Sequence, residues 1–431
     1  MTAFAGPILG LYGLGMRAAQ PLLLRKLARR ALAEPGYGHA VPERLGIYTH
    51  PVEARSELVW LHAVSLGETR AAAVLLQALR AAHPGLRFLL TQGTATGRAE
   101  GAALLQAGDV QVWQPWDSPQ AVKRFLVHFK PRLGILMETE VWPQWVARTR
   151  AAAVPLVLVN ARLSEKSQKQ AQRWPALARP AYGGLAGVWA QTERDAHRLR
   201  ELGAPVQGVL GNLKFDARPN AGQQALGRAV RSSASWPVLM FASSREGEEA
   251  LFLEAWRRHG PAGVQPLLVP RHPQRFEEVA ALAESAGWQV SRRSQWGAQL
   301  EHRPAPQPGT LWLGDSLGEM ALYYSLSQLA LLGGSFAPLG GQNLIEAAAC
   351  GCPVLMGPHT FNFSEAAEAA QAEGAAERVS DLDAALARVP ALCEVARHRA
   401  AAEAAHAFAA RHRGAAEATA TALGPWLDRQ A

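Results

Sequence analysis

The sequence predicts an α/β protein built from two doubly wound, mostly parallel sheets. At 431 residues, the chain exceeds what one compact core usually supports, and two domains of roughly 200 residues each are expected. Apolar strand-like runs alternate with helical stretches in both halves of the chain. A turn-rich segment without hydrophobic periodicity separates the halves.

Each apolar run is continuous, as is typical of parallel strands that are buried on both faces. The runs span residues 58–64, 87–93, 110–116, 133–139, 155–161 and 187–193 in the first half, and 237–244, 266–272, 310–316, 329–335 and 353–359 in the second. We expect an N-terminal Rossmann-like domain over 31–210, a linker over 211–222 (GNLKFDARPNAG) and a C-terminal Rossmann-like domain over 223–431, whose last helix could pack back on the first domain. We expect the domains to face one another across a cleft, with ligands bound beyond the carboxyl ends of the strands.

Composition excludes several classes of protein. Hydrophobic residues make up 48% of the chain and charged residues 19%, which favours a folded enzyme over a disordered protein. The net charge of +8 favours anionic partners, but arginines are scattered rather than interleaved with aromatics, which argues against nucleic acid. The three cysteines, Cys350, Cys352 and Cys393, form no disulfide framework or CxxC motif, so a reducing compartment is expected.

Residues 1–30 form a candidate membrane-associating segment. The run Ala3–Met16 has no charge and is followed by five basic residues, an order that differs from that of a signal peptide. The run is shorter than the ~20 residues that span a bilayer, so we expect a shallow anchor whose basic residues contact anionic head groups. The alternative is that the segment is the first buried helix of the N-terminal domain, because periodicity does not separate the two cases.

Three motifs of the first half follow predicted strands. In His62–Ala72, Glu68 opens a helix, where it is either a general base displayed toward the cleft or a carboxylate favoured by the helix dipole. Glu138 and Glu140 directly follow an apolar strand, where carboxylates are costly unless they are paired or used, which favours a function. The segment 160–167 (NARLSEKS) could hold a sugar hydroxyl or phosphate, or Ser164 could simply cap a helix.

Two motifs of the second half suit a nucleotide. Pro270, Arg271, His272 and Arg275 follow a strand, and a guanidinium on a rigid turn matches phosphate or carboxylate oxygens. The segment 313–324 (LGDSLGEMALYY) places Asp315, Gly318, Glu319 and Met320 before a helix and could contact a nucleobase and ribose.

The most specific motif of the second half is rich in glycine. Two pairs, Gly333-Gly334 and Gly340-Gly341, precede a helix start, so free amides and the helix dipole are expected to form an anion site. Within this helix start, Glu346 is expected to accept ribose hydroxyls.

A D-x-D pair, Asp381 and Asp383, is the spacing of a divalent cation site in some sugar transferases. Its context predicts instead that Ser380 caps a helix with acids in the first turn. No metal site and no cofactor are therefore expected.

Taken together, these motifs resemble the 3-deoxy-D-manno-octulosonic acid (Kdo) transferase family. The resemblance runs from about Val59 to Gly374 through HAVSLGE, METEVWP, NARLS, GNLKFD, PRHP, GDSLGEM and GGQNLIE. It implies a GT-B fold, CMP-Kdo as donor, lipid IVA (the bisphosphorylated lipid A precursor) as acceptor, and attachment to the cytoplasmic face of the inner membrane.

The resemblance also implies roles for single residues. Glu68 would be the base that deprotonates the acceptor 6'-hydroxyl, and Glu138 and Lys214 would stabilise the transition state. The implied CMP contacts are Pro270, Arg271, Gly318, Glu319, Met320, Asn343, Leu344, Ile345 and Glu346. Arg245 stands where the family is expected to have histidine, so it is assigned no role. The alternatives are a GT-B enzyme acting on a UDP-sugar, including an epimerase, and a membrane-tethered nucleotide-binding scaffold.

Overall fold

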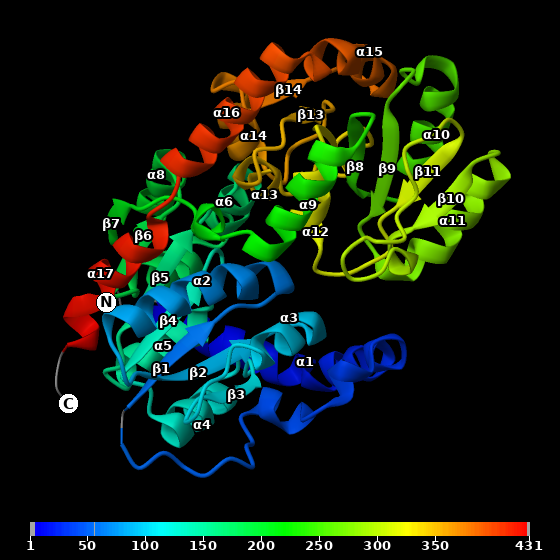
Figure 1. Ribbon diagram of the computed structural model, residues 1–431. Helices are drawn as coiled ribbons and strands as arrows, with labels where there is room; N and C mark the ends of the chain where they lie inside the picture. The colour runs from blue at the N-terminus through cyan, green and yellow to red at the C-terminus, as the bar shows by residue number, and fades with distance from the viewer. Residues whose placement is uncertain (1–4, 56, 429–431) are drawn as a thin grey trace. The chain divides into compact units, whose positions relative to one another are not determined.

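The computed structural model describes residues 5–55 and 57–428. The described chain divides into two compact units (Figure 1). The first comprises the residues up to Asp216 together with the segment from Arg413 onward, and the second runs from Ala217 to His412. The expected C-terminal domain, 223–431, thus gives its last helix to the first unit.

The first unit contains a seven-stranded sheet in the order β3-β2-β1-β4-β5-β6-β7, with parallel pairing throughout. Its strands are β1 (Leu58–His62), β2 (Arg87–Gln92), β3 (Val110–Trp113), β4 (Leu133–Met137), β5 (Leu156–Ala161), β6 (Gly187–Ala190) and β7 (Val206–Val209). Its helices are α1 (Ala5–Ala33), α2 (Leu66–Ala82), α3 (Ala95–Ala102), α4 (Pro119–Phe129), α5 (Pro143–Ala151), α6 (Glu165–Gln172), α7 (Pro175–Gly183), α8 (Glu193–Glu201) and α17 (Ala415–Leu427), with short 3-10 helices η1 (Pro35–Gly38), η2 (Val41–Leu45) and η3 (Leu213–Asp216).

Side chains that alternate along each strand form two hydrophobic cores, one on each face of this sheet. Leu58 and Trp60 of β1 pack with α4, α5 and α8, whereas Val59 and Leu61 pack with α2, η3 and α17. This two-sided burial explains why the strands are continuously apolar in sequence. The fold class predicted from those runs is confirmed.

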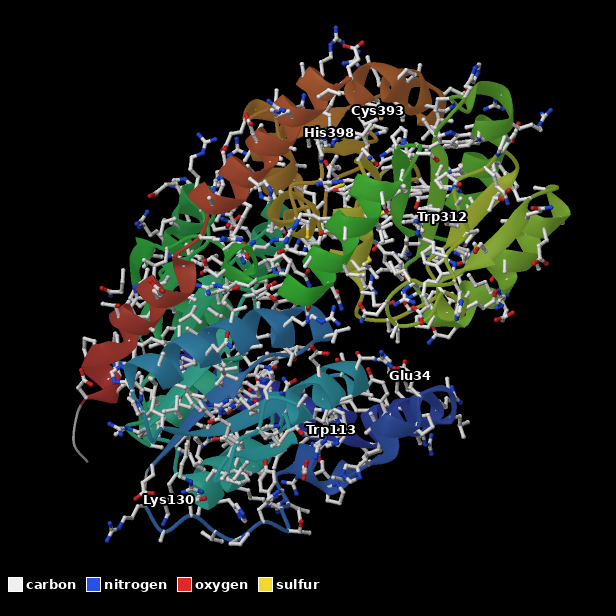
Figure 2. All side chains as sticks on the ribbon, viewed as in Figure 1. Glu34, Trp113, Lys130, Trp312, Cys393 and His398 are labelled. Atoms are coloured by element: carbon white, nitrogen blue, oxygen red, sulfur yellow. The ribbon has the colours of Figure 1, made fainter. Side chains whose placement is uncertain are left out.

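The second unit repeats the architecture with a seven-stranded parallel sheet in the order β10-β11-β9-β8-β12-β13-β14. Its strands are β8 (Val238–Ser244), β9 (Gln265–Pro270), β10 (Gln289–Arg292), β11 (Thr310–Leu313), β12 (Leu329–Leu332), β13 (Val354–Met356) and β14 (Ala376–Arg378). Its helices are α9 (Ala221–Ser233), α10 (Glu248–His259), α11 (Phe276–Ser285), α12 (Met320–Leu326), α13 (Ile345–Ala349), α14 (Ser364–Ala372), α15 (Leu382–Cys393) and α16 (Val395–Arg411), with η4 (Pro273–Arg275) and η5 (Arg293–Gln295). Figure 2 labels Trp113 and Trp312, which are fully buried in the first and second units respectively.

The linker expected over 211–222 is partly structured. Leu213 and Phe215 of η3 are buried in the first unit, and Asp216 accepts hydrogen bonds from the backbone N–H groups of Gly414 and Ala416 at the start of α17. The helix α17 packs on α2 and η3. The sequence motif LKF therefore belongs to a folded element of the first unit, because its apolar side chains are used in a core.

The helix α1 has one packed face and one exposed face. A Cβ on Gly13 would lie 2.7 Å from Pro119 Cγ, so glycine permits close packing on the start of α4. On the same side, the carbonyl of Leu9 accepts a 2.9 Å hydrogen bond from Gln144 Nε2. The side chains of Leu11, Leu14 and Leu22 are 64–68% exposed. No helix within the described ranges has the length and apolar character needed to cross a membrane.

Candidate functional site

The first candidate site lies at the carboxyl end of the first sheet, between β1 and β4. The chain reaches β2 and β3 on one side of β1 and then crosses to β4 on the other, so these neighbours mark the point where the winding reverses. The loops that follow such a pair diverge and leave room for a ligand. Glu68 follows β1, and Glu138 and Glu140 follow β4, so this edge collects three carboxylates.

Glu68 is held by the turn that precedes α2. Its Oε2 accepts a 2.8 Å hydrogen bond from Val64 N–H, and its Oε1 accepts a 3.2 Å bond from the Ser65 hydroxyl. Ser65 is the N-cap of α2, and its Oγ accepts from Glu68 N–H at 3.4 Å. This reciprocal arrangement resembles a capping box. The hydrogen bonds of Glu68 are therefore those of a residue that stabilises the start of a helix, as the second interpretation of this carboxylate predicted.

The ionisation of Glu68 is nevertheless perturbed in the direction that a base requires. Burial is the main cause that raises the pKa of Glu68, and the negative charges of Glu138 and Glu140 act in the same direction. The hydrogen bonds from Val64 and Ser65 oppose the rise, and the resulting pKa is about 7. A carboxylate with a pKa near neutrality is a more effective general base than an ordinary one. A Cβ on Gly67 would meet no atom within 4 Å, so there is open space beside the turn.

Glu138 and Lys214 form an ion pair. The distance from Lys214 Nζ to Glu138 Oε1 is 3.0 Å, and the side chains are 23% and 11% exposed respectively. Glu138 directly follows the last residue of β4. Its φ of 54° is an unusual backbone conformation for a residue other than glycine. The structure thus brings together two residues that are 76 positions apart in sequence and that were both expected at the site.

Asn160, at the end of β5, was not assigned a role in positioning this pair. Its φ is 50°, its Oδ1 accepts a 3.1 Å hydrogen bond from Leu213 N–H, and its carbonyl accepts a 3.0 Å bond from Gln191 Nε2. The Nδ2 of Asn160 is buried without a hydrogen-bond partner among the described protein atoms. Since Leu213 directly precedes Lys214, Asn160 fixes the backbone from which the lysine reaches Glu138.

The other polar residue discussed in the NARLSEKS segment has a local role. Ser164 is the N-cap of α6, and its Oγ accepts a 3.1 Å hydrogen bond from Ser167 N–H. The helix-cap alternative for Ser164 is therefore confirmed.

In the second unit, Pro270 ends β9 and is buried, whereas Arg271 is exposed. The backbone N–H of Arg271 donates a 3.0 Å hydrogen bond to the Ser244 carbonyl.

Arg275 is largely buried and binds Glu249 at 2.8 Å and Glu278 at 2.9 Å. Arg275 therefore ties α10 to α11 rather than facing a ligand. Burial lowers the pKa of His272, and the charges of Arg271, Arg245 and Arg275 lower it further, which places these cations close together.

The run Gly318–Met320 lies in the connection from β11, the strand next to β9, to α12, and Met320 is the first residue of that helix. Gly318 has a φ of 76°, and its carbonyl accepts a 2.9 Å hydrogen bond from Gln223 Nε2. The Glu319 carboxylate binds Arg293 at 2.7 Å and also accepts from the Ser316 hydroxyl. This carboxylate is thus engaged within the protein, and Met320, the first residue of α12, is half-buried.

The expectation of free amides at the first glycine pair is wrong. The buried Glu248 carboxylate accepts hydrogen bonds from the N–H groups of Gly334 at 2.7 Å, and of Phe336 and Ala337 at 3.2 Å each. Its Oε2 also accepts from Arg245 N–H at 2.9 Å. The amides therefore already bind an internal anion, which sequence reasoning could not identify because Glu248 is 86 residues from Gly334 in the chain.

The helix start after the second glycine pair is built around Asn343. Its Oδ1 accepts a 3.0 Å hydrogen bond from Ile345 N–H, while Leu344 and Ile345 are buried with 1% and 2% exposure. These two side chains belong to the core, so only their backbone groups could meet a ligand. Glu346 lies in the first turn of the five-residue helix α13 and is half-buried.

The D-x-D pair has structural roles. Asp381, rather than Ser380 as expected, is the N-cap of α15, since its Oδ1 accepts a 2.8 Å hydrogen bond from Ala384 N–H. Asp383 pairs with Arg258 at 3.0 Å. Throughout residues 5–55 and 57–428, no three His, Cys, Asp or Glu side chains are grouped so that they could hold a metal ion.

Comparisons with known proteins agree with the site. Residues 39–217 match the family model described as 3-deoxy-D-manno-octulosonic-acid transferase (kdotransferase). The 3-deoxy-D-manno-octulosonic acid transferase of Bordetella pertussis is 46% identical, over 97% of this chain and 99% of that protein. The enzyme of the same name from Haemophilus influenzae is 32% identical, over 80% of this chain and 81% of that protein.

Among solved structures, UDP-GlcNAc 2-epimerase from Neisseria meningitidis has a TM-score of 0.55 at 15% identity, covering 86% of this chain and 100% of that one. That likeness concerns the fold alone. The two Rossmann-like units are of the GT-B type, and 46% identity over nearly the full length of the Bordetella pertussis enzyme settles the family. The chain is a glycosyltransferase that belongs to the 3-deoxy-D-manno-octulosonic acid (Kdo) transferase family.

Proposed function

We propose that the protein transfers Kdo from CMP-Kdo to lipid IVA at the cytoplasmic side of the inner membrane, in lipopolysaccharide biosynthesis. The observation that carries the proposal is the environment of Glu68. Its carboxylate is oriented by Val64 and Ser65, borders open space at Gly67, and has a pKa of about 7. A hydroxyl nucleophile needs such a base, whereas a nucleotide-binding scaffold without turnover does not.

In the proposed reaction, Glu68 accepts the proton of the acceptor 6'-hydroxyl as the oxygen bonds to the anomeric carbon of Kdo. The bond from that carbon to the CMP phosphate breaks on the opposite side, so the configuration inverts, and CMP leaves with the electron pair. The Glu138–Lys214 pair, 3.0 Å apart and largely buried, supplies fixed charges beside the reacting groups. Charges that are fixed in advance stabilise a transition state without reorganisation.

The second unit is proposed to bind CMP. The exposed Arg271, close to Arg245, supplies positive charge for the phosphate, and the backbone of Gly318–Met320 and Asn343–Glu346 supplies polar groups for the nucleoside. CMP is a phosphate monoester leaving group, so guanidinium groups can balance its charge. We therefore propose that transfer requires no metal ion.

Membrane association is proposed for α1. Its exposed leucines, Leu11, Leu14 and Leu22, recur at helical spacing, and the exposed Arg25 and Arg29 continue the same stripe. An apolar stripe that ends in basic residues suits the interface of an anionic leaflet. Nucleic acid is not proposed as a partner.

Mass spectrometry of lipid IVA tests the proposal. Lipid IVA is incubated with purified protein, CTP, Kdo and the activating synthetase, and parallel reactions contain UDP-sugars instead. We expect products heavier by one or more Kdo residues with the CMP-Kdo system alone. Glu68→Ala should lose nearly all product while retaining CMP binding. Transfer only from a UDP-sugar, or wild-type activity of Glu68→Ala, would refute the proposal.

A further inference from the structure

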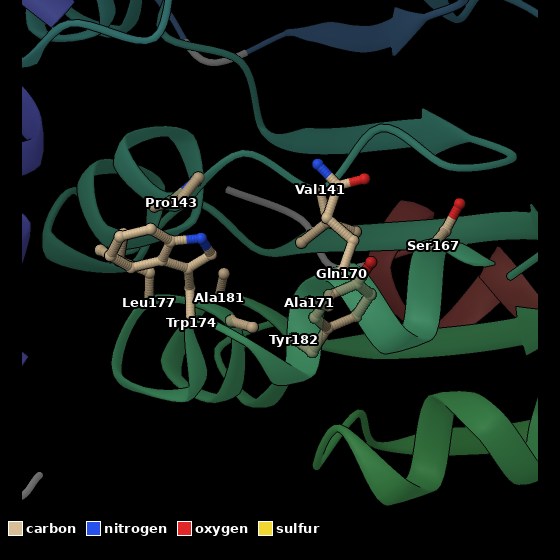
Figure 3. A pocket seen from close by; sticks show the side chains of 10 residues that line it. Val141, Pro143, Ser167, Gln170, Ala171, Trp174, Leu177, Ala181 and Tyr182 are labelled. Carbon is tan, nitrogen blue, oxygen red and sulfur yellow. The ribbon is translucent and has the colours of Figure 1, made fainter. Parts of the chain in front are cut away.

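A groove in the first unit lies between the start of α5, the end of α6 and α7. It has a volume of about 310 Å³ and is lined mainly by apolar side chains, among them Val141, Pro143, Ala171, Trp174, Leu177 and Tyr182. Figure 3 shows the Trp174 ring between Pro143 and Leu177, with Ala171 and Tyr182 farther along the groove. Trp174 is 69% exposed, although an indole buries more apolar area than most side chains when it has a partner.

The groove begins next to the carboxylates of the candidate acceptor site. Val141 follows Glu140 in the chain, and the Glu140 carboxylate is fixed by a 2.7 Å hydrogen bond from Trp142 Nε1. At the other wall, burial raises the pKa of Tyr182 to about 12 and the charge of Glu140 contributes in the same direction. Glu140 also acts on Glu68, so one carboxylate lies near both the groove and the proposed base.

The surroundings of the groove are basic. Four of the five charged residues between Ser164 and Gly184 are cations, namely Lys166, Lys169, Arg173 and Arg179, and all four are exposed. The helix α7, which forms one wall, also packs against α1. An apolar groove that is edged by cations and lies beside Glu140, a carboxylate that acts on the proposed base, is complementary to a molecule with an acyl chain, anionic groups and a reactive hydroxyl.

We infer that this groove binds an acyl chain of the lipid acceptor and that Trp174 covers the bound chain. The inference rests on the proposed function, because it assigns a subsite to the acceptor of that reaction. Each methylene group buried against Trp174 and Leu177 contributes about 0.8 kcal/mol, which corresponds to roughly a fourfold change in affinity. The contact would therefore appear in KM for acylated acceptors and not in the chemical step.

The test compares Trp174→Ala, Trp174→Phe and Val127→Ala in the complete protein, with lipid IVA and with its fully deacylated bisphosphate disaccharide at one detergent concentration. Val127 on α4 is 58% exposed and does not line the groove, so it is the control for loss of exposed apolar surface. Trp174→Ala should raise KM for lipid IVA about fifteenfold, as expected for two lost methylene contacts, and leave kcat/KM for the deacylated acceptor unchanged. Trp174→Phe and Val127→Ala should behave like the wild type.

Several outcomes would overturn the inference. One is an equal effect of Trp174→Ala on both acceptors, or no effect on either. A second is that Trp174→Ala weakens binding to acceptor-free vesicles as much as it raises KM, since the surface would then be a membrane contact. A third is that the variant converts an oligomer into a monomer in light scattering, since a second copy would then occupy the groove. Absence of Kdo transfer by the wild-type protein to both acceptors would instead refute the proposed function.

Discussion

The side chain of Asn160 binds the backbone N–H of Leu213 at 3.1 Å, and the next residue, Lys214, places its ammonium 3.0 Å from Glu138. Glu138 and Asn160 end neighbouring strands, and both have positive φ, at 54° and 50°. Two strained strand ends and one 3-10 helix thus determine the position of a single ion pair. Such strain is retained where the surrounding structure requires a particular side-chain direction.

Replacing Asn160 should therefore impair catalysis through Lys214. Asn160→Ala removes the acceptor for Leu213 N–H and puts alanine, which tolerates the left-handed region less well than asparagine, at this position, at a combined cost of about 2 to 4 kcal/mol. Asn160→Gly removes the same hydrogen bond without the second penalty. Both variants should lose kcat for Kdo transfer with little change in KM for the donor. Asn160→Gly should unfold at a higher temperature than Asn160→Ala. Equal melting temperatures, or wild-type kcat in both variants, would contradict this interpretation.

The pH dependence of transfer should report Glu68. Because the base must be ionised, kcat/KM should fall about tenfold per pH unit below pH 7, where Glu68 is protonated. Glu140→Gln removes a negative charge that raises the pKa of Glu68, so the acid limb should move to lower pH. The glutamine oxygen can still accept the hydrogen bond from Trp142 Nε1, which preserves the loop. An acid limb that stays in place or moves upward in Glu140→Gln would argue against Glu68 as the titrating base.

The apolar runs were sufficient to predict most of both sheets. Each of the eleven runs coincides with a strand. Ten of these strands are central in their sheets and buried on both faces, which makes them continuously apolar, whereas the eleventh, β3, is an edge strand. The strands β7, β10 and β14 were not predicted. They lie at sheet edges, have only three or four residues, and include half-exposed positions, so they lack a continuous apolar run.

The site was only partly predictable for a different physical reason. Glu68 and Glu138 stand out in sequence because a carboxylate beside a buried strand is costly unless it is paired or used. The contacts of Asn160 with Leu213, and of Glu248 with the Gly334 loop, join residues 53 and 86 positions apart. Those pairings follow from which strands become neighbours in the sheet, and no local pattern encodes them.

The Glu138–Lys214 ion pair should contribute more to the stability of the first unit than an exposed ion pair does. Lys214→Met leaves the 11% exposed Glu138 carboxylate without this cation and should destabilise the first unit by about 1 to 3 kcal/mol. Lys169→Met is the matched control, because Lys169 and Glu165 are 68% and 66% exposed and such pairs contribute less than about 1 kcal/mol. Adding Glu138→Gln to Lys214→Met should restore part of the stability but not the activity, as measured by denaturant unfolding and kcat. Additive losses of stability would mean that the two groups are not coupled.

Glu248 should be essential for the second unit. Its carboxylate accepts four backbone N–H groups, so Glu248→Ala leaves these donors without their acceptor and should cost roughly 3 kcal/mol or more. Because the Gly334 loop would lose its anchor, CMP affinity should fall at least tenfold in calorimetry. The exposed Glu246, two residues earlier, provides the stability control Glu246→Gln, which should melt like the wild type. Unchanged CMP binding by a folded Glu248→Ala variant would separate this loop from the nucleotide site.

Vesicle binding should distinguish the two faces of α1. Leu11, Leu14 and Leu22 are exposed, whereas Gly13 is in contact with Pro119 and Gln144, so serine at the three leucine positions should leave the fold intact. The triple variant should lose at least tenfold in partitioning to anionic vesicles, since each buried leucine contributes about 1.5 kcal/mol or more. Arg25→Gln with Arg29→Gln should lose about 30-fold on anionic vesicles and nothing on neutral ones, at about 1 kcal/mol per cation. Val127→Ser on α4 controls for exposed apolar surface in general. If the leucine variant partitions like the wild type while the arginine variant does not, the attachment is purely electrostatic and the exposed leucines serve another contact.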